Sequence, residues 1–165
     1  MSSTTPKRID PRVRQLLAHL ELSEETACWL EFLRPKKFIP ERSECHINAW
    51  IQSRYEGGSI STGWVVWQDH AADFVEAQFH TVWKDPNRVL RDVTPRQDRE
   101  RTVLFVPDTQ RTVRFIHYDD RLAVVIFDNV RMREGTLLNG LRERTHILTT
   151  AQIYEHGLAM ATTDK

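Results

Sequence analysis

The stretch FVEAQFHTVW, residues 74–83, decides the fold, because its side chains alternate with the two-residue period of a β-strand. One face carries Val75, Ala77, Phe79, Thr81 and Trp83, and the other carries Phe74, Glu76, Gln78, His80 and Val82. The face that includes His80 is mixed and polar. We expect this face either to meet solvent or to form the wall of a cleft.

The chain is predicted to turn back directly after this strand. Residues 84–88 form a polar turn that contains proline, and residues 89–94 predict a strand that returns antiparallel to the first. Asp92 and Thr94 share one face of the returning strand. We therefore expect Asp92 to lie opposite His80 or close to it.

Four further segments also have the period of a strand. Their residues are 63–67, 102–106, 113–118 and 122–127. The connections between the predicted strands are short and contain proline or aspartate, which is typical of turns. Together the six segments predict an antiparallel meander.

Helical patterns lie mainly before the strands. The predicted helices cover residues 11–20, 23–34, 43–55 and, after Thr149 or Thr150, a last segment that ends at Met160. Asp10 and Ser43 are the expected N-caps of the first and third helices. Helices followed by strands predict an α+β fold, with N-terminal helices packed on an antiparallel β-sheet.

The composition limits the classes of partner. The chain has 165 residues, and 23 Lys and Arg balance 23 Asp and Glu, so no basic excess attracts nucleic acid or an anionic membrane. We expect one domain, residues 1–165, with flexible segments 1–9 and 161–165. The sequence shows no secretory signal and no apolar run of about 18 residues, so a cytoplasmic location is expected.

The two cysteines are expected to differ in role. Two cysteines are too few for a disulfide framework and have no CxxC spacing. Cys28 falls inside the second predicted helix and is expected to be structural. Cys45 falls in the first turn of the third predicted helix, where unsatisfied N–H groups and the helix dipole favour a thiolate.

Cys45, His80 and Asp92 together form a candidate catalytic triad. The thiolate of Cys45 is the expected nucleophile, His80 exchanges the proton, and Asp92 orients the imidazole. Glu76, on the same strand face as His80, is the alternative orienting carboxylate. Because adjacent helix residues point in different directions, His46 is not expected to serve the thiol.

Two motifs resemble a known family. The segment HTVWKDPNRVLRDVTP, residues 80–95, resembles the His-strand, turn and Asp-strand signature of transglutaminase-like proteins, within the wider papain-like superfamily. The segment SECHINA, residues 43–49, is similar to the helix start that carries the cysteine. The resemblance covers residues 43–95 and implies a minimal papain-like or transglutaminase-like catalytic core there.

The resemblance also departs from the family pattern. No glutamine shortly precedes Cys45 to complete an oxyanion hole of the papain type. The backbone N–H of Cys45 is one expected donor, and the candidates for a second oxyanion or substrate-binding group are Asn48, Trp64, Gln68 and Glu76. Trp64, Trp67 and Trp83 flank the predicted hairpins and are candidates to line a substrate cleft, but the core is the expected place of Trp67 and Trp83.

The function expected from these residues is cysteine-dependent acyl transfer through a thioester. The substrate is a protein, peptide or other amide or thioester, with water or an amine as acceptor, and the scheme requires no cofactor. The alternatives are a noncatalytic member of the same fold that binds a protein or peptide, and a metal site built from Cys45, His46 and His80 with His117. The oligomeric state is not predicted.

Overall fold

The computed structural model describes residues 3–149 and 151–157. Its helices are α1 (Pro11–His19), α2 (Cys45–Glu56) and α3 (Gln152–Glu155), and η1 (Glu24–Thr26) is a single 3₁₀ turn. The predicted helix end near Met160 and the segment 161–165 lie outside the described residues. Within the described chain the elements form an α+β fold with two antiparallel sheets.

The larger sheet contains the strands that build the candidate site. Its order is β1 (Cys28–Glu31), β5 (Thr102–Pro107), β2 (Ser59–Asp69), β3 (Phe74–Lys84), β8 (Val130–Arg133) and β9 (Thr136–Asn139), and β4 (Leu90–Arg91) also pairs with β3. The smaller sheet has the order β10 (Glu143–Ile147), β7 (Arg121–Phe127) and β6 (Arg114–Tyr118).

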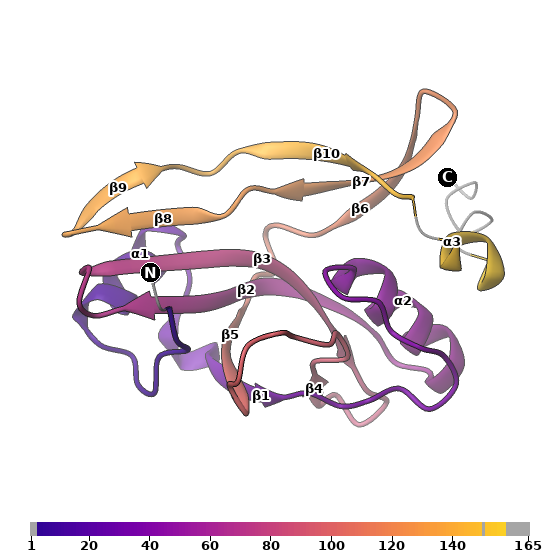
Figure 1. Cartoon of the computed structure of the whole chain (residues 1–165), viewed down its shortest axis with the longest axis horizontal. Coiled ribbons are helices and arrows are strands. Elements are labelled where there is room, and N and C mark those ends of the chain that lie inside the picture. Colours follow the sequence, from indigo (N-terminus) through magenta and orange to yellow (C-terminus); the bar gives the residue numbers. More distant parts are fainter. Residues whose placement is uncertain (1–2, 150, 158–165) are drawn as a thin grey trace.

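The hairpin of β2 and β3 forms the centre of the molecule. The two strands pair along their full length, from Ser59 opposite Lys84 to Asp69 opposite Phe74. Figure 1 shows them side by side across the middle of the molecule, with α2 next to their right-hand part. One face of the hairpin packs in the main core, and the other face packs in a second cluster with β1 and β5.

The main core is built from both sheets and the helices. Its largest fully buried side chains include Leu16 and Leu17 from α1, Ile47 and Ile51 from α2, and Trp64 from β2. Removing apolar surface from water is the dominant favourable term in folding. This core therefore fixes the positions of α1 and α2 against the central hairpin.

The structure confirms the first predicted helix and its cap. The Oδ1 atom of Asp10 accepts a hydrogen bond from the backbone N–H of Val13 over 2.9 Å, and Pro11 occupies the first helical position. Val13, Leu16 and Leu17 point into the core. The N-terminal segment that leads to this cap was expected to be flexible up to residue 9.

Specific contacts hold part of that N-terminal segment. Thr4 and Gln68 exchange two backbone hydrogen bonds of 2.8 Å, and the buried Thr5 hydroxyl accepts a bond from Leu104 N–H over 2.8 Å. These contacts attach residues 4 and 5 to β2 and β5.

The second predicted helix is wrong. Ser23 caps only the 3₁₀ turn, with Oγ accepting from Glu25 N–H over 3.2 Å, and the chain then forms β1. Cys28 therefore lies in a strand opposite Phe105 of β5. Leu30 packs with residues of β5 in the second cluster, and this packing stabilises the extended backbone. Leu33, which the helical pattern placed on the buried stripe, is exposed.

The predicted meander is also wrong in its order. The strand β5 pairs with β1 and β2 rather than with a sequential neighbour, and β6 and β7 belong to the separate smaller sheet. The returning strand β4 is only two residues long. The strands β8, β9 and β10 were not predicted: each has only four or five residues, and β9 and β10 consist mainly of exposed or half-buried side chains.

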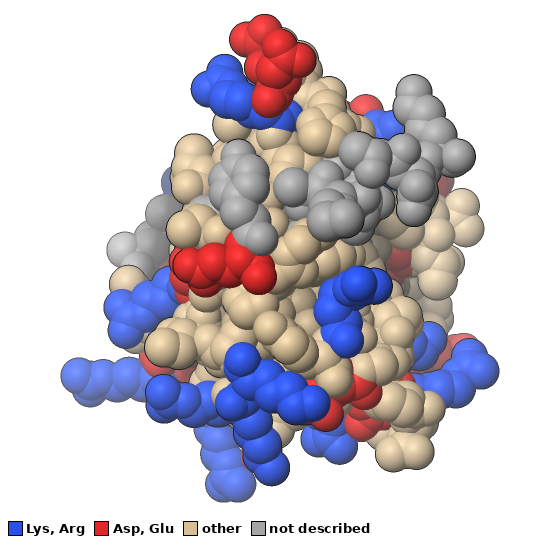
Figure 2. All heavy atoms as spheres, turned by 90° about the vertical axis from the view of Figure 1, so that its right-hand side faces the viewer, with Lys and Arg blue, Asp and Glu red and all other residues tan. Residues whose placement is uncertain are grey.

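Charge is distributed over the surface without a net excess. Figure 2 shows Lys and Arg side chains gathered along the lower part of one face, with Asp and Glu between them and at the top. No helix among the described residues has the length and apolar character needed to cross a membrane.

Gly63 permits a close approach of two strands beside the candidate site. It lies opposite His80 of β3 and opposite Pro107 of β5. A Cβ atom at this position would overlap the Val106 carbonyl oxygen and lie 2.7 Å from Phe105 Cζ. The backbone of β5 leaves no room for a side chain there.

We therefore predict that Gly63→Ala lowers the free energy of unfolding by about 1–3 kcal/mol, because β5 must move away from β2. Chemical denaturation followed by circular dichroism measures this change. Gly140→Ala is the matched control, because its added Cβ would meet only Leu137 Cδ2 at 3.7 Å. Equal stability of the two variants would contradict the close-approach argument.

Candidate active site

The start of α2 holds Cys45 at the first helical position. Glu44, rather than the predicted Ser43, is the N-cap, and its side chain makes no capping hydrogen bond. The first helical bond runs from Asn48 N–H to the Glu44 carbonyl over 2.9 Å. The N–H groups of Cys45, His46 and Ile47 therefore precede the helical ladder and contribute the positive end of the helix dipole.

Ser43 is excluded as the cap by its backbone conformation. Its φ of 62° lies in the left-handed region, whereas an N-cap residue usually has an extended conformation. The prediction that Cys45 lies in the first turn is nevertheless confirmed.

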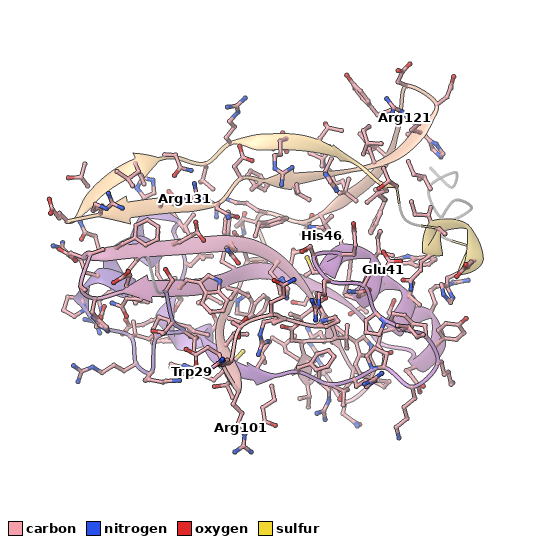
Figure 3. All side chains as sticks on the ribbon, viewed as in Figure 1. Trp29, Glu41, His46, Arg101, Arg121 and Arg131 are labelled. Carbon is pink, nitrogen blue, oxygen red and sulfur yellow. The ribbon has the colours of Figure 1, made fainter. Side chains whose placement is uncertain are left out.

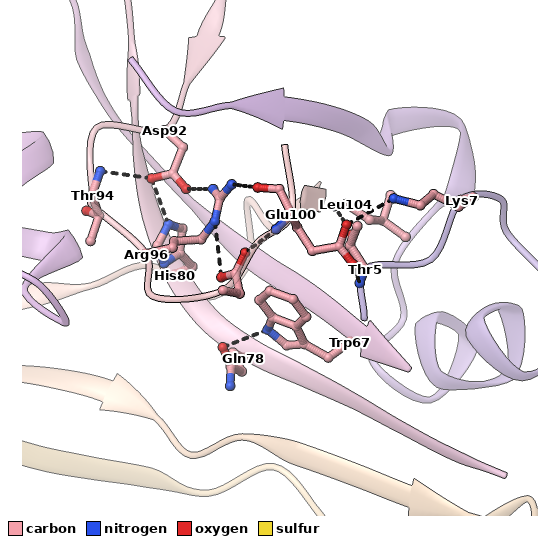
Figure 4. A network of polar contacts seen from close by, with 11 residues as sticks. Thr5, Lys7, Trp67, Gln78, His80, Asp92, Thr94, Arg96, Glu100 and Leu104 are labelled. Atoms are coloured by element: carbon pink, nitrogen blue, oxygen red, sulfur yellow. Dashed lines mark hydrogen bonds and ion pairs between the residues drawn. The ribbon is translucent and has the colours of Figure 1, made fainter. Parts of the chain in front are cut away.

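The structure brings His80 and Asp92 together. His80 lies on β3, and Asp92 follows the short strand β4. The distance from His80 Nε2 to Asp92 Oδ1 is 3.2 Å, as Figure 4 shows from close by. The Asp92 side chain is fully buried, and 15% of the His80 side chain is exposed.

Two further groups hold the Asp92 carboxylate. Its Oδ1 atom also accepts a bond from Thr94 N–H over 3.1 Å, and its Oδ2 atom accepts one from Arg96 Nη1 over 3.0 Å. Arg96 is anchored in turn by a 3.0 Å bond to the Glu100 carbonyl (Figure 4). This arrangement fixes the carboxylate against the imidazole edge.

The environment keeps Asp92 ionised. Burial alone raises the pKa of this carboxyl, but the positive charge of His80, their hydrogen bond, the Thr94 N–H and the Arg96 charge lower it below its usual value. With an ionised partner, His80 Nε2 carries a hydrogen and donates it to Asp92. The other ring nitrogen, Nδ1, is not engaged by Asp92.

Cys45 and His80 shift each other's pKa in opposite directions. Burial raises the pKa of Cys45, but the charges of His46 and His80 and their hydrogen bonds to the sulfur bring it well below the value of a free thiol. For His80, burial lowers the pKa, whereas the charges of Asp92 and Cys45 and the hydrogen bonds to them raise it to about 10. The favoured state is a thiolate paired with an imidazolium.

Cys28 has the opposite tendency. Burial raises its pKa, and no charged partner offsets that effect in the described chain. Both cysteines are free of disulfides. The two thiols of this chain therefore differ in the charge that they carry near neutral pH.

A cavity of about 510 Å³ opens beside the three residues. Cys45, His80 and Asp92 all contribute to its wall. The remaining lining residues are Arg42, Ser43, Val65, Trp67, Gln78, Phe79, Thr94, Pro95, Arg96, Gln97, Asp98 and Asn129. A polar reactive corner thus adjoins an apolar wall made by Val65 and Trp67.

Trp67 lies at the cavity and not in the core, where it was expected. It is partly exposed, lines the cavity and donates its indole N–H to Gln78 Oε1 over 2.8 Å. Trp83 is buried as expected and donates to the Gly57 carbonyl.

The structure does not bring Trp64, Gln68 or Glu76 into this cavity. Trp64 is fully buried and donates to Asp108, and Gln68 donates to the helix cap Asp10. Gly63 is the partner of His80 across the hairpin, so the odd-numbered residues of β2 share the His80 face, and Trp64 and Gln68 point the other way.

Glu76 and Asn48 have structural partners instead. Glu76 precedes His80 in β3 and binds Gln78 and Arg131. Of the two candidate carboxylates, only that of Asp92 reaches His80. Asn48 binds the backbone of Glu41 through both its amide atoms, at 3.0 and 2.7 Å, and donates to Thr94 Oγ1. It does not line the cavity.

His46 has a place that the sequence pattern did not predict. It was expected to point away from the thiol, yet its charge and a side-chain hydrogen bond act on Cys45. It is buried, and its Nδ1 atom lies 2.6 Å from Thr81 Oγ1. The contact with Thr81 on β3 fixes the position of the ring, which helix geometry alone does not reveal.

The metal alternative finds no geometric counterpart in the described residues. Across residues 3–149 and 151–157, no group of three or more His, Cys, Asp or Glu side chains is arranged to hold a metal ion. His117, part of the proposed ligand set, lies on β6 of the smaller sheet.

Comparison with known proteins assigns no family: no protein-family model, curated protein or solved structure matches this chain.

The lowered pKa of Cys45 predicts the pH dependence of its alkylation. A thiolate is present above the pKa of the thiol, so the rate of labelling by iodoacetamide rises with pH and then levels off. We call this rise the Cys45 limb, and we expect it well below pH 9.0, with labelling still high at neutral pH. Cys28 labels only at a higher pH, because its pKa is raised. Peptide mass spectrometry after timed labelling at each pH measures both rates. Slow and equal labelling of both thiols at pH 6 would contradict the ion pair.

Asp92→Asn removes the charge that favours the imidazolium, so we predict that the Cys45 limb moves to higher pH. At a pH on the rising part of the limb, below the Cys45 pKa, labelling then falls by roughly tenfold if that pKa rises by about one. The control is Asp85→Asn, in the turn between β3 and β4. Asparagine there keeps an acceptor for the N–H groups of Asn87 and Val89, and Asp85 is outside the cavity. The same displacement of the limb in both variants would contradict a specific role for Asp92.

Proposed function

We propose that this chain is a cysteine-dependent acyl-transfer enzyme that acts on an amide, peptide or thioester through a thioester on Cys45. The observation that carries the proposal is the position of His80. Its Nε2 atom is held 3.2 Å from the buried Asp92, while the same ring lowers the pKa of a thiol at a helix start. Nucleophile, base and orienting group are the three parts that this chemistry requires.

The first half of the proposed reaction forms the thioester. The Cys45 thiolate attacks the carbonyl carbon and forms a carbon–sulfur bond, and the carbonyl oxygen takes the negative charge. The imidazolium of His80 then gives its Nδ1 proton to the leaving nitrogen or sulfur as the old bond breaks. The leaving group departs neutral, and His80 is left neutral beside the ionised Asp92.

The second half restores the enzyme. Neutral His80 accepts a proton from water or an amine, which attacks the thioester carbon. Collapse of the tetrahedral intermediate breaks the carbon–sulfur bond and returns the thiolate and the imidazolium. Water as acceptor corresponds to a peptidase, amidase or deamidase, and an amine corresponds to a transglutaminase-like transferase.

The start of α2 supports the oxyanion in this scheme. The N–H of Cys45 precedes the helical ladder and lies at the positive end of the dipole, next to the attacked carbon. The four predicted partners for that N–H are absent from the cavity wall, as described above. The apolar wall of Val65 and Trp67 is suited to a side chain next to the scissile bond.

The chain order of the three residues supports a relation to transglutaminase-like and papain-like enzymes. In the proposed core the cysteine starts a helix, the histidine follows on a long strand, and the aspartate comes after the next turn. The proposed relation extends over residues 43–95. A noncatalytic protein that binds peptides in the same cavity is the rival proposal, and it does not require an ionised Cys45.

An activated ester separates the two proposals. We predict that p-nitrophenyl acetate acetylates Cys45, releasing p-nitrophenolate in a burst, and that acid quenching traps the acyl-enzyme for peptide mass spectrometry. Cys45→Ala abolishes the burst, and Cys28→Ala, the matched control, keeps it, because Cys28 lies outside the cavity. Release that is the same in Cys45→Ala and the unmodified protein would overturn the proposal.

A further inference from the structure

His46 lies between the two elements that carry the proposed nucleophile and base. It follows Cys45 in α2, and Thr81, its partner, follows His80 in β3. Figure 3 shows His46 at the end of α2 that meets β3. Only 7% of the His46 residue is exposed, and Thr81 is fully buried. The contact between Nδ1 and Oγ1, at 2.6 Å, therefore joins α2 to β3 in a place that water does not reach.

One aromatic ring and several titratable groups lie near His46. The Phe79 ring lies 6.0 Å from it, centroid to centroid, in a tilted arrangement. Charged and titratable groups face it from each adjoining element: Glu44 and Cys45 at the start of α2, His80 on β3 through their shared thiol, and His146 on β10. Cys45 is the one sulfur in this set and the one that also contacts His80.

We propose that His46 is a second hydrogen-bond donor to the Cys45 thiolate and that Thr81 positions it for this role. The inference rests on the proposed function and adds a positioning residue to the same site. Thr81 occupies Nδ1, so the other ring nitrogen, Nε2, is the donor in the proposed bond to the sulfur.

The hydroxyl of Thr81 suits this arrangement because it can both accept and donate. When the ring is protonated, Nδ1–H donates to Oγ1. When the ring is neutral, Oγ1–H donates to Nδ1, and the hydrogen stays on Nε2. Both forms present an N–H to the thiolate, and the partner of the ring is a neutral hydroxyl instead of a carboxylate.

The two imidazoles therefore have different tasks. His80 is paired with Asp92 and transfers the proton. His46 has no part in that transfer, and its hydrogen bond stays with the sulfur throughout. In the first half the donor raises the population of the thiolate, and in the second half it stabilises the negative charge that returns to sulfur as the carbon–sulfur bond breaks.

The pH dependence of Cys45 alkylation tests this assignment. In a Cys28→Ala background only Cys45 reacts, and the rate constant for iodoacetamide is measured between about pH 4 and pH 10. We expect His46→Phe to move the limb to higher pH, with a rate roughly tenfold lower on the rising part of the limb if the pKa of Cys45 increases by about one, since below the pKa the thiolate fraction then falls tenfold. Thr81→Val is expected to move it in the same direction.

Two controls separate this role from a structural one. Thr81→Ser keeps the hydroxyl, so its Cys45 limb is expected at the same pH as in the parent protein. His146→Gln removes a nearby imidazole that has no part in the thiol contacts and is expected to leave the limb in place. Circular dichroism identifies any variant that does not fold, and Thr81→Val decides the matter if His46→Phe is one of them.

The outcomes distinguish this inference from the proposed function. An unchanged limb in His46→Phe or in folded Thr81→Val, together with a displaced limb in His80→Ala, would overturn the role of His46 and leave the triad intact. A limb near pH 9 in the parent protein, unchanged by His80→Ala, would overturn the triad itself. Equal displacement in Thr81→Val and Thr81→Ser would also overturn the role of the Thr81 hydroxyl.

Discussion

The backbone pairing of β2 with β3 is the interaction on which the rest of the structure depends. Both sheet faces are defined by this hairpin, because its register decides which side chains enter the main core and which meet the cavity. The helix α2 packs on β3, and β5 is held against β2. A slip of one residue would send His80 into the core and Phe79 into the cavity wall position that His80 holds.

Burying an ionised carboxylate at Asp92 is costly, and its surroundings show how the cost is offset. An isolated charge taken out of water is penalised by several kcal/mol, and the penalty is recovered only with good geometry and further hydrogen bonds. Asp92 receives an imidazole, an amide and a guanidinium, all within 3.2 Å. The charge is thereby retained next to the imidazole of His80.

Local patterns in the sequence predict the local features well. The cap at Asp10, the long strand β3, the first-turn position of Cys45 and the nearness of Asp92 to His80 all follow from short-range rules of spacing. Features that depend on partners distant in the sequence cannot be predicted from these short-range rules. Residues 28–31 have a helical stripe but become a strand because β5 is available, and Trp67 faces the cavity because of a register that the sequence does not reveal. His46 was misjudged for the same reason, since its orientation comes from Thr81 on another element.

Asn48 links parts of the chain that are far apart in sequence. Its amide donates to Thr94 Oγ1 over 3.2 Å, and the N–H of Thr94 donates to Asp92. The helix that bears the sulfur and the segment that bears the carboxylate are therefore joined by hydrogen bonds through Thr94, at the wall of the cavity. Residues 94–98 form part of the cavity wall. The cavity wall and the helix start that carries the sulfur therefore share one set of hydrogen bonds, and the wall cannot be rebuilt by substitution without disturbing the support of the thiol.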